Sequence, residues 1–253
     1  MMDALDRFYQ DNKIAAMSFE CSHRGDCHSG NGDFVEAKEA FVGSEYVKGT
    51  LPRVLFISLD AASVSKTREH RTWPYIRDQE ESHFDHKYHH NPHWRETHAF
   101  AFEILKDIAR ERHINLTTKP AAGLASNVCR YFAHTNSAKC KDVNRGRNQG
   151  RERFFNNCRE FIPGEICILQ PALIVTQGDK AHQAVEGAFP PICSKQHPTD
   201  PNYVYRILRI NNMPVMWFKT YHPSCYGLFY RARRDVYPWC FTEARKFFNK
   251  YYP

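Results

Sequence analysis

Short apolar segments alternate with longer amphipathic ones along most of the chain. Residues 53–58 and 171–176 are continuously apolar runs with β-branched members, which predicts strands buried on both faces. Residues 130–136 form another candidate strand, and 203–210 and 215–219 flank an Asn-Asn pair that predicts a hairpin turn. The pattern therefore predicts a central sheet of four to five strands.

Amphipathic segments between these strands predict helices. Apolar positions recur at helical spacing over 5–17, 97–112, 154–161, 182–185 and 239–251. Strands that alternate with helices indicate an α/β fold, in which a mainly parallel sheet lies between two helical layers. We expect a single domain of this three-layer α/β/α kind over residues 1–253, with a polar, histidine-rich excursion around 70–98.

Composition narrows the class of protein. No run of about 18 uncharged apolar residues occurs, so we expect no membrane span. The first residues lack the basic and then apolar pattern of a secretory signal. Nine cysteines are an odd number for a disulfide framework, so we expect reduced thiols in the cytoplasm. The net charge of +7 favours a polyanionic partner such as nucleic acid.

Four of the cysteines are placed as two pairs, Cys21 with Cys27 and Cys140 with Cys158. Two loop thiols and two distant ones are typical of a tetrathiolate metal site, which holds either an iron–sulfur cluster or a structural zinc. The other cysteines lie mostly in apolar surroundings, where we expect them to pack as small hydrophobic residues. They are Cys129, Cys167, Cys193, Cys225 and Cys240.

Polar residues follow three of the predicted strands, namely Asp60, Asn136 and His222. Parallel strands end along one edge of a sheet, where α/β proteins bind their ligands, so these side chains can converge on a catalytic site. Each also has a structural alternative: a helix N-cap for Asp60, a turn residue for Asn136 and a loop histidine for His222.

Three motifs in the second half of the chain carry a family resemblance. Thr135-Asn136-Ser-Ala-Lys139-Cys140 resembles the pattern T-N-x-x-K-C, residues 164–178 resemble E-I-x-x-x-x-P-x-x-I-V-x-L-G, and His222-Pro223-Ser224 matches H-P-S. Together they resemble the iron–sulfur branch of the uracil-DNA glycosylase superfamily. The likeness runs in matching order from Cys21 to Tyr237, apart from the excursion.

The resemblance implies roles for the polar residues. Asp60 would be the carboxylate that holds a water, Asn136 would hydrogen-bond the uracil edge, His222 would lie beside uracil O2, and Ser224 would approach a DNA phosphate. The implied activity is excision of uracil, or a related deaminated base, from DNA by a monomer. The four paired cysteines would ligate a structural [4Fe–4S] cluster.

The sequence departs from the branch at its first motif. The branch reads G-E-A-P-G there, whereas residues 58–62 read Ser-Leu-Asp-Ala-Ala, which aligns Asp60 with the aspartate of the superfamily's G-Q-D-P-Y version. The front cysteines are C-x5-C instead of C-x2-C. These departures leave two alternatives: an iron–sulfur protein of the same fold that binds nucleic acid without cleaving it, and a zinc-bound tetracysteine protein.

The DNA-binding surface is predicted from charge and aromatic residues. A rim of basic side chains, with a solvated charged face as its alternative, is expected at Lys139, Lys141, Arg145, Arg147, Arg151, Arg153, Arg231, Arg233 and Arg234. Aromatic residues that can wedge into DNA, with core packing as their alternative, are Tyr226, Phe229 and Tyr230. The aromatic that would stack on the base is not assigned; the candidates are Trp73, Tyr75, Phe84 and Trp94.

The excursion contains a cluster of histidines around Asp85. A transition metal bound there would indicate a metal-dependent hydrolase, but we favour an exposed polar loop. The residues concerned are His83, His86, His89, His90, His93 and His98.

Overall fold

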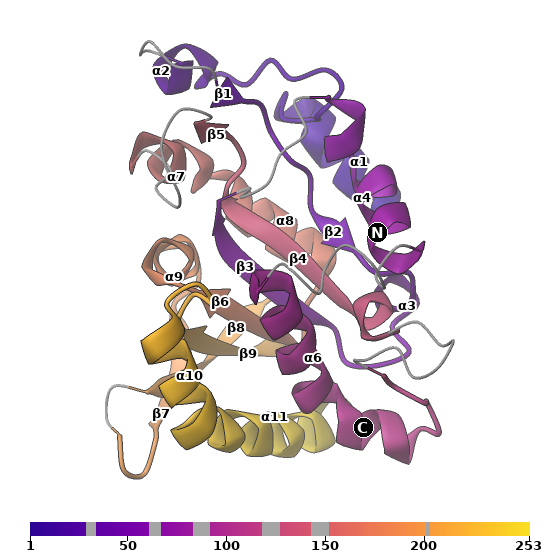
Figure 1. Ribbon diagram of the computed structural model, residues 1–253, viewed down its shortest axis with the longest axis vertical. Helices are drawn as coiled ribbons and strands as arrows, with labels where there is room; N and C mark the ends of the chain where they lie inside the picture. The colour runs from indigo at the N-terminus through magenta and orange to yellow at the C-terminus, as the bar shows by residue number, and fades with distance from the viewer. Residues whose placement is uncertain (29–33, 61–66, 83–91, 118–126, 143–151, 201–202) are drawn as a thin grey trace.

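Figure 1 shows the computed structural model, which describes residues 1–28, 34–60, 67–82, 92–117, 127–142, 152–200 and 203–253. Its centre is a sheet that has seven strands within these residues, in the order β2-β4-β3-β6-β9-β8-β7. The strands are β2 (Phe41–Val42), β3 (Val54–Asp60), β4 (Phe132–Ala138), β6 (Leu173–Gln177), β7 (Pro191–Gln196), β8 (Val204–Ile210) and β9 (Met213–Thr220).

Four neighbouring strands, β4, β3, β6 and β9, are mutually parallel, and β2, β8 and β7 pair antiparallel at the edges. The expected mainly parallel sheet is confirmed, but four to five strands was too few. Strand β2 is only two residues long, and all six residues of β7 are exposed. Neither strand has the apolar pattern from which a strand is predicted. The predicted turn at Asn211 and Asn212 is confirmed, since both have the positive φ angles (48° and 65°) of a two-residue hairpin turn.

Helices cover both faces of the sheet. On one face lie α6 (Pro92–Glu111), α10 (Tyr226–Asp235) and α11 (Tyr237–Tyr251) (Figure 1). Their apolar residues pack with those of the strands in one core. The other face is covered by α1 (Met2–Asp11), α3 (Ser44–Lys48), α8 (Phe161–Leu169) and α9 (Asp179–Glu186). Two cores on either side of a sheet confirm the three-layer α/β/α fold.

Smaller elements surround these layers. They are α2 (Arg24–His28), β1 (Phe34–Val35), the 3-10 turns η1 (Glu69–Arg71) and η2 (Val128–Tyr131), α4 (Trp73–Ser82), β5 (Lys141–Asp142) and α7 (Glu152–Cys158). Strands β1 and β5 form a separate two-stranded sheet. None of the helices within the described residues has the length and apolar character that crossing a membrane requires.

Two helices differ from the sequence prediction. Helix α1 ends at Asp11, not at residue 17, because Lys13 takes a left-handed conformation (φ 55°) and the chain turns back through the bond from Ile14 N–H to Tyr9 O. Helix α6 begins at Pro92, five residues before the predicted start; proline suits the first helical turn. The excursion is therefore not one continuous irregular stretch, since it contains α4 and the first turns of α6.

The alternation of side chains along the strands determines what faces α6. Val54 and Phe56 of β3 pack in the α6 core, whereas Leu55 and Ile57 pack in the opposite one. The residue that continues the first row is Ser58, which is 1% exposed. Polar side chains thus replace apolar ones towards the carboxyl ends of the strands.

Candidate active site

The carboxyl ends of the parallel strands bring the predicted site residues to one edge of the sheet. Asn136 of β4 pairs in register with Ser58 of β3, and Asp60 pairs with Ala138. His222 comes two residues after β9 ends. The backbone positions of Asp60, Asn136 and His222 therefore share the edge where open α/β sheets bind ligands. The side chain of Asp60 lies outside the described residues.

His222 is held in a defined tautomer by its own turn. The backbone N–H of Ser224 donates to Nδ1 of His222 at 3.2 Å, and the Ser224 hydroxyl lies 2.6 Å from the same nitrogen. An amide N–H can only donate, so Nδ1 is the acceptor and the neutral ring carries its proton on Nε2. Burial lowers the pKa of His222 to about 4, so the ring is neutral at pH 7 and presents Nε2–H as a donor.

The turn after β6 allows the His222 loop to come close. Gly178 has a φ of +98°, in the region that favours glycine. A Cβ atom there would lie 3.0 Å from Leu59 Cδ2 and 3.4 Å from His222 Cβ. Only glycine fits this position without displacing its neighbours.

His93, near the start of α6, connects His222 to the sheet. Its ring stacks on that of His222, with centroids 4.9 Å apart and planes 19° apart. Its Nε2 lies 2.9 Å from the Ser58 hydroxyl and 3.1 Å from Gln177 Oε1. Ser58 Oγ also lies 2.6 Å from Gln177 Oε1 and 2.8 Å from His134 Nε2. Residues from β3, β4, β6 and α6 thus form one polar network.

The direction of the hydrogen bonds in this network follows from Gln177. Its Nε2–H donates to Thr97 Oγ1 at 3.2 Å, and the Thr97 hydroxyl donates to the His93 carbonyl at 2.9 Å. Gln177 Oε1 therefore faces His93 and Ser58 and accepts from them. With the Ser58 proton directed to Gln177, His134 donates from its Nε2–H to Ser58 Oγ.

Both network histidines are uncharged. Burial, and secondarily the neighbouring His222, lower the pKa of His93 to about 3. Burial and the nearby His93 and Lys38 lower the pKa of His134 well below its ordinary value. The site therefore has hydrogen-bond donors of fixed direction and no imidazolium.

The histidine-rich segment was partly misassigned. His93 and His98 were expected in an exposed loop, but His98 is 1% exposed and both lie on α6, which packs against the sheet. The expectation is wrong for these two residues. The segment 83–90, which holds the other four histidines and Phe84, lies outside the described residues. Of the stacking candidates, Trp94 is buried in the α6 core and Trp73 packs against the opposite one.

The sequence analysis missed the anchoring residues Ser58, His134 and Gln177. A signal was available, because each is a polar residue that continues an apolar row towards the carboxyl end of its strand. Two polar residues in such positions on neighbouring strands predict a buried network.

Asn136 is buried, with 5% of its surface exposed. The residues around it in the motif lie in the opposite layer, against α8. Lys139 Nζ lies 2.5 Å from Glu165 Oε2 and 2.5 Å from Thr135 Oγ1, and Tyr9 donates to Glu165 Oε1 at 2.7 Å. Lys139 is only 1% exposed, so its assignment to a DNA-facing rim is wrong; the lysine is the cation of a buried ion pair.

The remaining rim residues divide into several groups. Arg153 donates to the carbonyl of Asp26 at 2.8 Å, and Arg233 pairs with the buried carboxylate of Glu96. Arg231 and Arg234 are exposed on α10. The segment 143–151, with Arg145, Arg147 and Arg151, lies outside the described residues. Of the basic residues predicted for the rim, Arg231 and Arg234 are therefore the exposed ones that the structure describes without a long-range partner in the fold.

Helix α10 also carries exposed apolar side chains just after the His222 turn. Tyr226, Leu228 and Tyr230 are 53%, 52% and 38% exposed, and the rings of Tyr226 and Tyr230 are stacked. Phe229 is 1% exposed and belongs to the core, so it is not a wedge.

The four paired cysteines line one small cavity together with Ile14, Phe19 and Phe161. Cys27 lies on α2, Cys158 ends α7, Cys21 precedes α2 and Cys140 follows β4. All four are free thiols. Burial and the other three thiols raise the pKa of Cys140 well above its ordinary value. The four cysteines of the two pairs therefore lie around the same cavity.

The cavity has the donor set and surroundings of a cluster site. Two N–H groups donate to its sulfur atoms at 3.3 Å, the backbone amide of Lys139 to Cys158 and Asn157 Nδ2 to Cys27. Within the described residues, no three His, Cys, Asp or Glu side chains are grouped around a single ion. In a four-iron cluster each thiolate binds its own iron, so the thiols surround the cluster and do not converge on a point. The residues present fit such a group.

The other cysteines behave in two ways. Cys129 and Cys240 are buried as expected, and Cys167 is half-buried. Cys193 and Cys225 are exposed, so the expectation that they pack as small hydrophobic residues is wrong.

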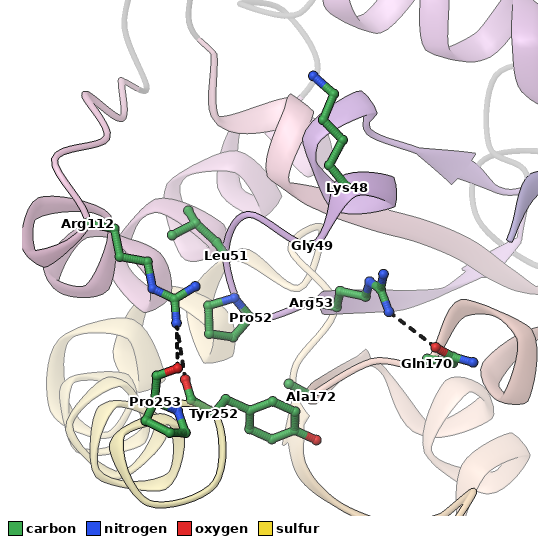
Figure 2. A pocket seen from close by; sticks show the side chains of 10 residues that line it. All are labelled: Lys48, Gly49, Leu51, Pro52, Arg53, Arg112, Gln170, Ala172, Tyr252 and Pro253. Atoms are coloured by element: carbon green, nitrogen blue, oxygen red, sulfur yellow. Dashed lines mark hydrogen bonds between the residues drawn. The ribbon is translucent and has the colours of Figure 1, made fainter.

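A pocket lined by basic residues lies at the opposite end of the strands (Figure 2). Two of its arginines bind other parts of the chain. Arg112 donates to the carbonyls of Tyr252 and Pro253 at 3.2 and 3.3 Å, and Arg53 donates to Gln170 Oε1 at 3.3 Å. These guanidinium groups hold segments of the chain itself. The pocket lies where β3 and β6 begin, away from His222.

The fold and the polar edge define an α/β protein whose ligand site lies beyond the carboxyl ends of its parallel strands. A family model, the uracil DNA glycosylase superfamily, matches residues 62–249, which is most of the chain. The chain therefore belongs to the uracil DNA glycosylase superfamily, whose members act on DNA, and it is a glycosylase-type enzyme in general. No curated protein matches the chain.

Proposed function

We propose that this protein removes uracil, or a related deaminated base, from DNA by hydrolysing the N-glycosidic bond. The observation that carries the proposal is the neutral His222, which presents Nε2–H at the same sheet edge as Asn136 and the end of β3. Membership of the superfamily supports glycosylase chemistry in general, and the side chains at the edge support uracil as the base.

His222 would stabilise the departing base. Cleavage leaves negative charge on uracil, and a donor fixed beside O2 stabilises that charge more in the transition state than in the ground state. A neutral imidazole donates this hydrogen bond without giving up its proton. Because Ser224 fixes the tautomer beforehand, no reorganisation of the ring is needed during the reaction.

Asn136 and Asp60 would complete the chemistry. An amide side chain both donates and accepts, so Asn136 can pair with N3–H and O4 of uracil and reject cytosine, whose edge has the opposite pattern. A carboxylate at Asp60 can orient the attacking water and stabilise the cationic sugar. The base must be flipped out of the DNA stack to reach these groups.

Helix α10 would contact the DNA around the flipped base. Its exposed tyrosines directly follow the His222 turn, and Arg231 adds positive charge on the same helix. Ser224, at the turn itself, would approach a phosphate. We expect the protein to act as a monomer.

Cys21, Cys27, Cys140 and Cys158 would hold a [4Fe–4S] cluster. When bound, such a cluster would contribute folding free energy at the end of β4, four residues from Asn136. A structural zinc is the second candidate; it needs all four sulfurs about 2.3 Å from one ion. Four thiols that line one cavity support the cluster.

Excision from a uracil-containing single-stranded oligonucleotide, read as alkali-labile breaks, tests the proposal. We expect breaks from the wild-type protein and a loss of about 10²- to 10⁴-fold in rate for Asp60→Ala. His222→Gln should lose about 10²- to 10³-fold. Asp11→Ala, at the exposed end of α1, is the matched control and should keep the wild-type rate.

The outcomes separate the enzyme from a binding protein. DNA affinity without any breaks, from a folded and iron-loaded protein, would overturn excision and favour the nucleic-acid-binding alternative. Equal rates for wild type and Asp60→Ala would remove Asp60 from the mechanism.

A further inference from the structure

Within the described part of the chain, the hydrogen bonds of the His222 ring do not fix its direction relative to the sheet. Its hydrogen bonds go to Ser224, two residues away, and so stay within its own turn. They determine the tautomer but move with the turn. The stack on His93 joins this ring to α6 and, through Ser58 and Gln177, to β3 and β6.

His93 is itself held firmly. Its Nε2 is shared between Ser58 Oγ and Gln177 Oε1, and its backbone carbonyl accepts from Thr97, which in turn accepts from Gln177. Each of these residues lies on a strand or on α6. A ring restrained at both its backbone and its edge makes a rigid platform for a second ring.

Ser58 connects this platform to the unusual first motif of the chain. Its hydroxyl contacts both His93 and His134, two buried imidazoles. Without a hydroxyl at this position, the buried Nε2–H of His134 would lose its acceptor, and the Nε2–H of His93 would keep only Gln177 Oε1. Ser58 and His93 therefore form one hydrogen-bonded unit, in which the serine anchors the histidine ring.

We propose that His93 is a positioning residue, which holds the His222 ring in the direction required by its substrate and is anchored by Ser58 and Gln177. This inference rests on the proposed function, because it names how the donor of that site is aimed. His93 acts through His222 and takes no proton.

The stack also explains how His222 stays uncharged. Among the described residues, the ring of His222 stacks on His93 of α6, and Lys38, from the segment before β2, acts on both His93 and His134. Both of those imidazoles are uncharged, and burial is what lowers the pKa of His222 to about 4. Removing the His93 ring would admit water beside His222 and raise its pKa towards the ordinary value.

The test compares His93→Ala with His93→Phe, which keeps an aromatic ring but has no hydrogen bond to Ser58. The readouts are kcat and KM on the single-stranded uracil oligonucleotide, and the pKa of His222 from NMR titration of its ring. A third variant, Ser58→Ala, keeps the His93 ring and removes its anchor. His113→Asn, two residues beyond the end of α6, is the control; His113 is exposed with a φ of 57°, which asparagine tolerates.

We expect His93→Ala to lose about 10²-fold in kcat, the effect of misplacing a catalytic group by about an ångström, with little change in KM. The pKa of His222 should rise from about 4 towards 6.5. His93→Phe should recover most of the kcat and the low pKa of His222. Ser58→Ala should give values of kcat and of the His222 pKa between those of His93→Ala and His93→Phe. Wild-type kcat and an unchanged His222 pKa in His93→Ala would overturn the proposal.

Two further outcomes are informative. An inactive His93→Phe with a wild-type His222 pKa would overturn positioning, since His93 would then act on the substrate itself. The titration also separates the two proposals. If the wild-type protein makes no breaks, excision fails, while the His222 pKa in the His93 variants still decides whether the stack positions and buries that ring.

If His93→Ala does not fold, the comparison of wild type with His93→Phe and Ser58→Ala tests the same proposal.

Discussion

The ammonium of Lys139 and the carboxylate of Glu165 form an ion pair at 2.5 Å between side chains that are 2% and 0% exposed. Thr135 and Tyr9 donate to the same carboxylate. The backbone amide of Lys139 also donates to Cys158. One residue thus joins the cysteine cavity, the strand that carries Asn136, and helices α1 and α8.

Removing one member of this pair should destabilise the protein strongly. Lys139→Met would leave Glu165 buried without a counter-charge, which typically costs about 3–5 kcal/mol. Urea unfolding of the wild type and the variant measures the difference in the free energy of unfolding. The double variant Lys139→Met/Glu165→Gln should recover much of the loss, because it leaves no buried charge and keeps an acceptor for Tyr9.

The matched control is the exposed pair of Lys48 and Glu45. Lys48→Met should change the free energy of unfolding by no more than about 1 kcal/mol. Similar losses at Lys48 and Lys139 would contradict the buried ion pair.

Stability should fall as the solution is acidified below about pH 6.5. Burial lowers the pKa of His93 and His98 to about 3, and that of His182 and His222 to about 4. These groups are ordinarily half-protonated near pH 6.5 in an unfolded chain, so below that pH the unfolded state binds protons that the folded state does not. Their contribution is fully present above about pH 6.5 and is lost as the pH falls towards 3–4.

The contribution of one histidine to this pH dependence of stability can be measured separately. Each buried histidine contributes up to about 1.4 kcal/mol per pH unit over that window. His98→Phe, in a site lined by Trp94 and Phe132, should reduce the slope of unfolding free energy against pH between 6.5 and 5. An unaltered slope for His98→Phe would show that His98 titrates in the folded state.

The cysteine cavity predicts a selective effect on iron. Cys140→Ser should lose the brown colour and most of the iron per chain, because it removes one of four thiolates. Cys129→Ser is the control: Cys129 is equally buried but lies in the α6 core, away from the cavity. Iron retained by Cys140→Ser, or zinc without iron in the wild type, would contradict the cluster assignment.

Tyr226 should matter for DNA and not for folding. It is 53% exposed on α10, so Tyr226→Ala should leave the unfolding transition nearly unchanged. Loss of one stacked base is worth about 1–3 kcal/mol, which corresponds to roughly a 5- to 150-fold weaker Kd for uracil-containing DNA. Fluorescence anisotropy at fixed salt measures it. Tyr251→Ala, exposed at the end of α11, is the control, and equal affinities for the two variants would remove Tyr226 from the interface.

The sequence predicted the parts of the molecule that have a strong local pattern. The strands at 53–58 and 171–176 are apolar enough to be recognised, and the motifs led to Asn136, His222 and the four cysteines. It could not place His93, because six histidines within a polar segment have no pattern that distinguishes the one facing the sheet. Lys139 was misplaced for a related reason. Its charge suggests the surface, and only the packing of α8 brings Glu165 to it.

The order of the strands has a consequence for how the chain reaches its native state. Strands β7, β8 and β9 are consecutive neighbours, so their pairing closes only short loops. The parallel pairing of β3 with β4 must instead bring together segments separated by residues 61–131. Because the entropy of loop closure rises with loop length, the half of the sheet that leads to His222 should form first. The slow step should then be the addition of β3, whose pairing with β6 spans residues 61–172, and chains arrested before it would expose an unpaired central strand that is prone to aggregate during synthesis.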